Sequence, residues 1–319
     1  MNEPGQLQNS GLSTFSSTEL LRYTLEKLKN NLATRRIPDR LKDPAYDTQR
    51  GAEICQLMFS LCHNDLAEYG VALKDFIDFS EEFLRLQMEL ERTGKYHFSS
   101  YSEAKKNIYD NPEVMERRYL QGLLLSQALW INQHKILNFF ISEFCINNFQ
   151  GGRMVEVPVG TGIFIAEFMQ RNLSWQAEGY DISSSAIAMA KRTVTFKVPQ
   201  APIQLEKKDV FDIQEKKPYH RIVCGLLLEN MENPALLLRQ LQKILSAEGM
   251  IFLTASVWAS TIDHLYLFKS VKEIQTMIRA YFDIEKELVL NVFPERTPEE
   301  EKTPLNYACI LKHKSLEHK

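Results

Sequence analysis

The spacing of apolar residues divides the chain into a helical first part and a second part in which strands alternate with helices. In the first part, apolar residues recur every three or four positions, as from Leu20 to Leu28, which predicts helices with one buried face. Ser17 and Thr18 can cap the first of them. Further helices are expected over about 48–68, 71–92, 112–131 and 137–144, with a break near 132–134 where the apolar stripe changes phase.

The second part contains short apolar runs of strand length, most of them separated by helical patterns. Strands are expected at 154–159, 177–180, 203–207, 221–227, 250–254, 284–292 and 307–311. The last two are separated by 294–304, a loop rich in Pro and Glu with no helical pattern, so they should pair as an antiparallel hairpin. We expect an α/β domain at 147–313, preceded by an all-α domain at 18–146, with a disordered tail at 1–17 and a second tail at 314–319.

Composition and charge add mainly exclusions. The chain has 319 residues, 44% of them hydrophobic and 25% charged, and a net charge of only -3, so no general attraction to nucleic acid or to a membrane surface is expected. Its five cysteines form no CxxC pair and predict buried thiols rather than disulfides or a metal site. The start of the chain has no signal-peptide pattern and no apolar run has membrane-spanning length, which together predict a reduced, cytoplasmic location.

The most informative motif is a glycine turn between the first strand and the helix after it. Gly160 and Gly162 allow positive φ and let a ligand approach the main chain. A turn of this kind also opens nicotinamide and flavin folds, but Ile165 stands where their third glycine would be, which weakens a dinucleotide interpretation. Glu156 lies in the strand before the turn, where a cofactor with a positive centre would give the carboxylate a partner.

Acidic residues also follow the next two strands. Asp181 stands where a carboxylate can accept hydrogen bonds from both ribose hydroxyls. Asp209 and Val210 follow the third strand and could bracket an adenine ring. Ligands of open α/β sheets bind at these carboxyl ends, so the three strand ends together predict a site for an adenosine-bearing cofactor.

With these motifs, residues 150–312 resemble the class I S-adenosylmethionine-dependent methyltransferases. The resemblance implies a Rossmann-like seven-stranded sheet ending in an antiparallel hairpin, with S-adenosyl-L-methionine as the cofactor and no metal. The segment from Gly225 to Pro234 resembles the family's segment after strand four, with Asn230 in place of the usual histidine. The implied cofactor-binding residues are Glu156, Pro158, Gly160, Thr161, Gly162, Asp181, Ile182, Asp209, Val210, Gly225 and Leu226.

Candidate residues for chemistry and for the substrate are fewer and less specific. His264, in the loop after the fifth strand, His134, at the helix break, and Tyr119 are the catalytic candidates, with packing or helix-end roles as the alternative for both histidines. Aromatic walls and acidic groups can line a substrate pocket, although packing is the alternative for most of these aromatic residues. The substrate-binding candidates are Tyr96, Phe98, Tyr101, Tyr109, Glu229 and Asp263.

The predicted activity is methyl transfer to a small organic molecule by in-line displacement, with an oxygen acceptor favoured over nitrogen or carbon. A large helical domain before the catalytic part resembles that of natural-product methyltransferases, which predicts that it closes over the pocket; it could also mediate a homodimer. Two alternatives are a cofactor-binding scaffold or regulator without transfer activity and a nicotinamide-dependent oxidoreductase.

Overall fold

The computed structural model describes residues 15–146, 151–214, 217–296 and 302–315. Most of the predicted tails at 1–17 and 314–319 lies outside these residues, as do positions 147–150 of the expected domain connection and part of the loop at 294–304.

The first part of the chain is helical, as predicted. Three of its segments, η1 to η3, are π-helical, a form that is rare in globular proteins. Its elements are α1 (Ser17–Leu28), α2 (Ile37–Arg40), α3 (Thr48–Leu61), α4 (Leu66–Thr93), α5 (Tyr101–Ala104), η1 (Lys105–Tyr109), η2 (Val114–Tyr119), α6 (Leu120–Leu129), α7 (Ile131–Phe139) and η3 (Phe140–Phe144).

The helix expected at 48–68 is wrong in its extent. It ends at Leu61, because His63 and Asn64 adopt positive φ values of 55° and 58°, which a helix cannot continue through. The side chain of Asp65 then accepts hydrogen bonds from the first backbone N–H groups of α4, so the next helix begins at Leu66 and not at 71.

The predicted break before α7 is confirmed two residues earlier than expected. Trp130 has an extended backbone, with φ -100° and ψ 115°, between α6 and α7. Its ring packs against Phe79 and Phe83 of α4. The change of helix direction is therefore fixed by an aromatic side chain in the core.

The second part forms a seven-stranded sheet with the order β3-β2-β1-β4-β5-β7-β6. The first five strands along the chain pair in parallel, and β7 runs antiparallel between β5 and β6, which confirms the predicted terminal hairpin and the α/β fold class. The strands are β1 (Arg153–Glu156), β2 (Gln176–Asp181), β3 (Ile203–Lys207), β4 (Tyr219–Cys224), β5 (Leu245–Val257), β6 (Phe282–Asn291) and β7 (Leu305–His313). The helices are α8 (Ile163–Arg171), α9 (Ser184–Lys197), α10 (Pro234–Ile244) and α11 (Val271–Arg279), with short η4 (Val210–Asp212) and η5 (Leu228–Asn230).

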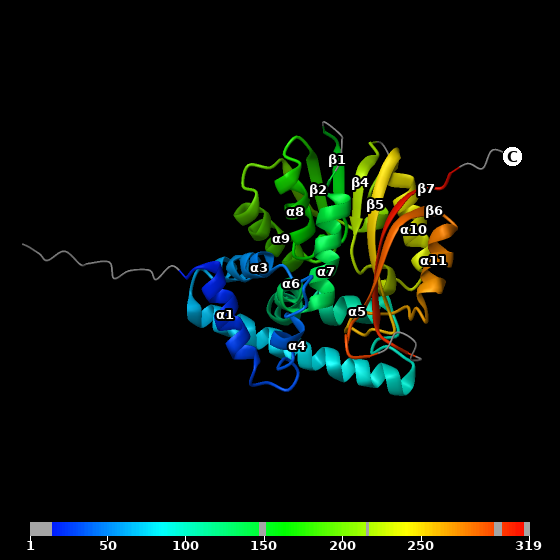
Figure 1. Ribbon diagram of the computed structural model, residues 1–319. Coiled ribbons are helices and arrows are strands. Elements are labelled where there is room, and N and C mark those ends of the chain that lie inside the picture. The colour runs from blue at the N-terminus through cyan, green and yellow to red at the C-terminus, as the bar shows by residue number, and fades with distance from the viewer. Residues whose placement is uncertain (1–14, 147–150, 215–216, 297–301, 316–319) are drawn as a thin grey trace, which may run out of the picture.

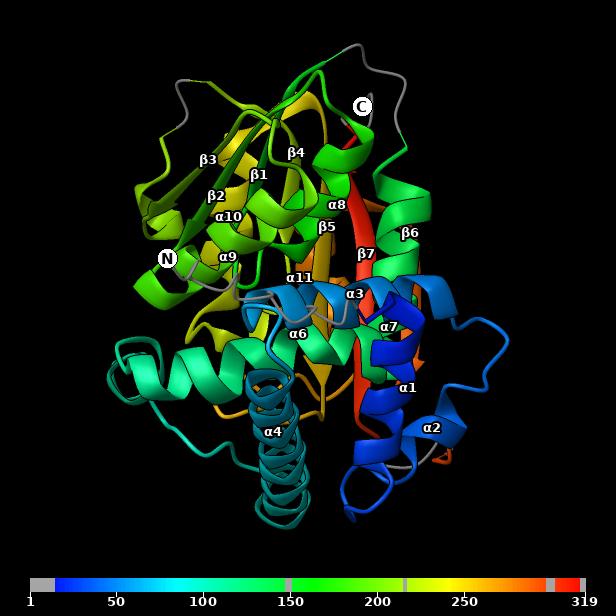
Figure 2. The ribbon, with the colours of Figure 1, turned by 90° about the vertical axis from the view of Figure 1, so that its left-hand side faces the viewer.

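Helices cover both faces of the sheet. Figure 1 shows α7, α8 and α9 on one face and α10 and α11 on the other, and Figure 2 shows α4 and α6 beneath the ends of β1 to β4. Phe140 and Phe144 of η3 contact Phe252 of β5. The largest buried cluster runs from Leu20 to Ile310, so the helical part shares its core with one face of the sheet.

Two further predictions concern single features. All five cysteines are buried free thiols, as expected. Among the described residues, no helix combines the length and the apolar character that crossing a membrane requires.

Candidate active site

A cavity of about 390 Å³ lies at the carboxyl ends of the strands. Its walls come from the ends of β1 to β4 and from Thr254 of β5 on one side, and from η1, η2, α6 and α7 on the other. This size is in the range of small-molecule sites. Residues of the helical part therefore line the cavity at the sheet edge where the sequence placed a cofactor.

The two glycines of the turn have different surroundings. Gly160 has φ +49° and lines the cavity, and a Cβ added there would meet no atom within 4 Å. Gly162 has φ +75° and does not line the cavity; its Cβ would stand 2.9 Å from Cα of Ala190 on α9. Gly160 thus leaves space for a ligand, whereas Gly162 lets α8 pack closely on α9.

Glu156 lies at the end of β1 and lines the cavity, with only 3% of its surface exposed. Its Oε2 accepts a hydrogen bond of 2.7 Å from the backbone N–H of Ile165 in the first turn of α8. Burial raises the pKa of Glu156 well above its usual value. A cationic ligand in the cavity, the partner that the sequence suggested for Glu156, would favour the charged form of its carboxyl group.

Asp181 lies at the end of β2 and links the turn to the next helix. Oδ2 accepts from the backbone N–H of Gly160 at 3.0 Å, and Oδ1 accepts from that of Ser183 at 2.9 Å. Burial raises its pKa to about 6, although these hydrogen bonds oppose the shift. A carboxylate can accept about four hydrogen bonds, so Asp181 retains capacity for ligand hydroxyls.

The third strand end and the segment after β4 complete this side of the cavity. Asp209 accepts from the backbone N–H of Phe211 at 3.0 Å, and both residues line the cavity with Val210. Leu226 has φ +49° and donates its backbone N–H to Oγ1 of Thr254. The lining includes every predicted cofactor-binding residue except Gly162, namely Glu156, Pro158, Gly160, Thr161, Asp181, Ile182, Asp209, Val210, Gly225 and Leu226.

Asp263, in the loop after β5, accepts hydrogen bonds from donors in distant segments of the chain. Oδ2 accepts from the Tyr109 hydroxyl at 2.9 Å, from Nδ2 of Asn230 at 2.8 Å and from the Tyr119 hydroxyl. Oδ1 accepts from Oγ1 of Thr261 at 2.6 Å. Burial and then Asp263 raise the pKa of both tyrosines well above the usual value, so both phenols stay protonated. Tyr109, Tyr119, Asn230 and Asp263 all line the cavity.

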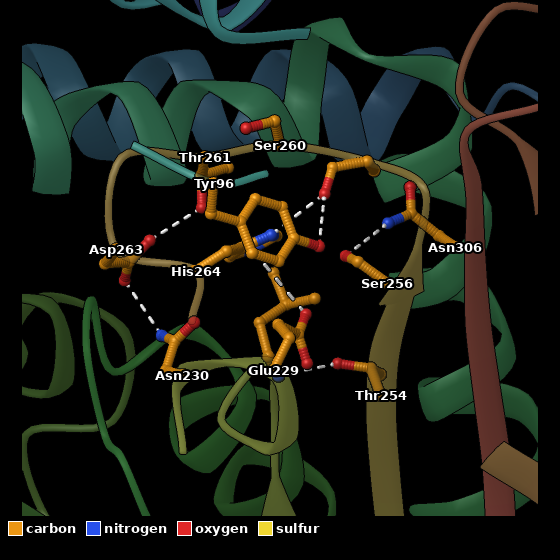
Figure 3. A network of polar contacts seen from close by, with 12 residues as sticks. Tyr96, Glu229, Asn230, Thr254, Ser256, Ser260, Thr261, Asp263, His264 and Asn306 are labelled. Carbon is orange, nitrogen blue, oxygen red and sulfur yellow. Dashed lines mark hydrogen bonds and ion pairs between the residues drawn. The ribbon is translucent and has the colours of Figure 1, made fainter. Parts of the chain in front are cut away.

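His264 and Glu229 form a buried pair outside the cavity lining (Figure 3). Nδ1 of His264 donates to the carbonyl of Ala259, and Nε2 lies 3.8 Å from Oε1 of Glu229, too far for a hydrogen bond. Burial lowers the pKa of His264 and raises that of Glu229 to about 8, so both are neutral near pH 7. The carboxyl group of Glu229 lacks a well-aligned hydrogen bond among the described residues, although Ser256 is close enough to oppose its pKa shift.

The other predicted residues are divided. Tyr101 lines the cavity, whereas Tyr96 and Phe98 do not: the Tyr96 hydroxyl donates to the carbonyl of Ala259, and Phe98 packs against the apolar cluster that contains Met115 and Leu120. His134 also lies outside the lining, with Nδ1 donating to the carbonyl of Gln127 and Nε2 accepting from the backbone N–H of Asp47. Burial lowers its pKa to about 4. Both histidine candidates are thus buried away from the cavity.

The sequence missed the wall that α6 and α7 provide. Their periodicity indicates helices, but one apolar stripe cannot distinguish core-facing residues from cavity-facing ones. Two polar residues could have indicated this wall, because Gln127 and Gln133 interrupt the apolar stripes near the helix break. The residues missed on this wall are Leu120, Leu123, Gln127, Gln133 and Ile136.

Comparison with known protein families matches residues 129–297, more than half of the chain, to a methyltransferase domain. The chain belongs to this methyltransferase family. It is a class I S-adenosylmethionine-dependent methyltransferase. No curated protein sequence matches the methyltransferase significantly.

Several solved structures resemble the methyltransferase at low sequence identity. The N-methyltransferase NodS from Bradyrhizobium japonicum, in complex with S-adenosyl-L-homocysteine, is 10% identical over 67% of this chain and 98% of its own, with a TM-score of 0.46. A methyltransferase from Thiobacillus denitrificans is 13% identical over 59% and 96%, with a TM-score of 0.45. The [4+2]-cyclase SpnF is 12% identical over 57% and 82%, with a TM-score of 0.47. We infer no acceptor from these likenesses.

The cavity of the methyltransferase fits S-adenosylmethionine in two respects. The position of Gly160 is open where a ligand must approach the main chain, and acidic residues stand at three successive strand ends. Glu156, Asp181 and Asp209 supply carboxylates for an ammonium or sulfonium group and for ribose hydroxyls. No described histidine or arginine lines the cavity, and Lys208 is its one lysine.

Proposed function

We propose that this enzyme methylates a small organic molecule, most favourably at an oxygen atom, in a pocket closed by the helical part of the chain. The observation that carries the proposal is that two groups of polar residues line one cavity, which we assign to its cofactor end and its acceptor end. One end has the glycine turn and the strand-end acids Glu156, Asp181 and Asp209. The other has Tyr109, Tyr119 and Asp263, which suit an acceptor molecule and not a nucleoside.

In this proposal, each residue at the cofactor end has a binding role. Asp181 accepts from the ribose hydroxyls, Asp209 and Val210 border the adenine, and Glu156 faces the positive charge of the methionine portion. When bound, S-adenosylmethionine supplies an electrophilic methyl group. The protein then needs chiefly to align the acceptor and to exclude water.

At the acceptor end, Tyr119 connects the cavity to Asp263. Its hydroxyl proton is directed to Asp263, so its oxygen can accept a hydrogen bond from a hydroxyl group of the methyl-accepting molecule. This arrangement gives an acceptor proton a path through Tyr119 to Oδ2 of Asp263. We assign His264 and Glu229 to positioning the loop that carries Asp263, because both lie outside the lining.

The helical part contributes the cover in this proposal. Tyr109 ends η1 and Tyr119 ends η2, and π-helical turns often occur at functional sites. Both hydroxyls bind Asp263 of the sheet-bearing part, 154 and 144 positions away along the chain. We infer that these contacts hold the helical cover over the acceptor.

Incubation of the protein with methyl-labelled S-adenosylmethionine and a metabolite extract tests the proposal. Label should move into the small-molecule fraction, and the transfer should fall in Asp263→Asn, which keeps the shape but lacks the negative charge. A Tyr266→Phe variant is the control, because the Tyr266 hydroxyl donates to Glu273 and Tyr266 does not line the cavity. Label that is bound and never transferred would favour a scaffold instead.

A further inference from the structure

Three hydrogen-bonding groups at the acceptor end already donate to the protein itself. A carboxylate can only accept, so the hydroxyl protons of Tyr109 and Tyr119 must both point to Asp263. Nδ2 of Asn230 also donates to Asp263, and it lies 3.2 Å from the Tyr109 oxygen. These two hydroxyls and the Asn230 amide are therefore not available as donors to a substrate.

Acceptor atoms, by contrast, remain unsatisfied. Oδ1 of Asn230 is buried without a hydrogen-bond partner among the described residues, on a side chain that is only 7% exposed. Oε1 of Gln127 is in the same state, and its side chain is also 7% exposed. The Tyr119 oxygen keeps its lone pairs once its proton is directed to Asp263. The two amide oxygens have no surface toward the cavity, so the acceptor that a donor on the ligand would meet is the Tyr119 oxygen.

Charge at this end has one sign. Asp263 is the carboxylate that we place at this end, and no described arginine or histidine lines the cavity. Lys208, the one lining lysine, follows β3 at the cofactor end, where Nζ lies 3.0 Å from Glu206 and 4.4 Å from the centre of the Tyr180 ring. A carboxylate or phosphate on the substrate would be buried near Asp263 without a protein cation. The helical wall is mainly apolar, with Met115, Leu120, Leu123 and Ile136, and its polar members are Gln127 and Gln133.

The geometry points to a specific substrate class: an uncharged, largely apolar molecule whose reacting group is itself an O–H or N–H donor, and which carries no carboxylate or phosphate. This inference rests on the proposed function, because it assigns the acceptor end of the same cavity. The Tyr119 oxygen accepts a hydrogen bond from the donor, and the negative charge of Asp263 disfavours anions.

Equilibrium binding to the protein saturated with S-adenosyl-L-homocysteine tests the inference with three matched probes. These are 4-ethylphenol, 4-ethylanisole, which lacks the donor, and 3-(4-hydroxyphenyl)propanoate, which adds a carboxylate. Calorimetry should find 4-ethylphenol at least about tenfold tighter than either of the others, which corresponds to about 1.4 kcal/mol. Equal or tighter binding of the propanoate or the anisole, or no binding of any probe, would overturn the substrate class. Failure of S-adenosyl-L-homocysteine itself to bind would instead count against the proposed function.

A variant pair locates the effect. Tyr119→Phe should weaken 4-ethylphenol about fivefold or more while leaving 4-ethylanisole unchanged, because only the phenol donates to the missing oxygen. Tyr266→Phe removes a hydroxyl that also donates to a carboxylate, at 3.3 Å from Glu273, but outside the cavity, and should change neither affinity. Equal weakening of both probes by Tyr119→Phe would contradict the donor assignment. The comparison of probes on the unmodified protein remains decisive if that variant does not fold.

Discussion

Alanine substitutions at Gly160 and Gly162 should separate ligand binding from folding within one turn. Both glycines have positive φ, which a side chain tolerates poorly. At Gly162 the added Cβ would also lie 2.9 Å from Cα and 3.0 Å from Cβ of Ala190. Since one of these atoms is backbone of α9, the contact can be relieved only by moving the helix. At Gly160 the added Cβ meets nothing within 4 Å.

The expected magnitudes differ accordingly. A residue forced into the left-handed region costs about 1–2 kcal/mol, which applies to both variants. Overpacking adds about 1–3 kcal/mol at Gly162 alone, so Gly162→Ala should lower the free energy of unfolding by about 2–5 kcal/mol and Gly160→Ala by about 1–2 kcal/mol. For cofactor affinity we expect the reverse order, because Gly160 lines the cavity and Gly162 does not.

Urea unfolding of the cofactor-free protein gives the first quantity, and calorimetric titration with S-adenosyl-L-homocysteine gives the second. Gly160→Ala should weaken binding at least about tenfold, or 1.4 kcal/mol, whereas folded Gly162→Ala should bind within about threefold of the unmodified protein. The reasoning fails if Gly162→Ala unfolds like the unmodified protein, or if it loses affinity while Gly160→Ala keeps it.

Three other variants test single residues. Asp181→Asn should weaken S-adenosyl-L-homocysteine by about 1–3 kcal/mol in calorimetry, and an unchanged affinity would remove this residue from the cofactor site. The pKa of Glu229 is raised from 4.5 to about 8, so between these pH values the folded protein binds more protons than the unfolded chain, and its stability falls as the pH rises. Glu229→Gln should reduce this pH dependence of the free energy of unfolding, measured in urea at pH 5 to 9. The same pH dependence in the variant and the unmodified protein would refute this assignment. His264→Gln should lower the free energy of unfolding by about 1–3 kcal/mol with little change in cofactor affinity, because His264 is buried outside the cavity. A variant with unchanged stability and weakened cofactor binding would argue for direct contact between His264 and the cofactor.

The fold and the cofactor end were predictable because their signals are local. A short apolar run followed by Gly160 predicts a strand and a turn, and the acids follow their strands within a few positions. The order of the strands then brings Glu156, Asp181 and Asp209 to one edge. The helix boundary at Leu61 was missed although Asn64 and Asp65 are typical of a helix interruption and a cap.

The acceptor end was less predictable because its contacts join distant segments. Asp263 meets Tyr109 and Tyr119, and nothing in the spacing of these residues indicates that meeting. Adjacent positions also differ in direction: Asp263 lines the cavity, whereas His264 points into the interior toward Glu229. A histidine that stands out in the sequence is therefore a weaker guide here than the acid beside it.

The shared core has a practical consequence for dissecting this chain. Phe140 and Phe144 lie against Phe252 on the sheet, and each buried aromatic side chain hides roughly 150–250 Å² from water. A recombinant fragment that starts at residue 147, where the composition changes, would leave that sheet face bare and prone to aggregation. A fragment that starts before Ile131 would carry its own covering for this face, and truncation should begin there.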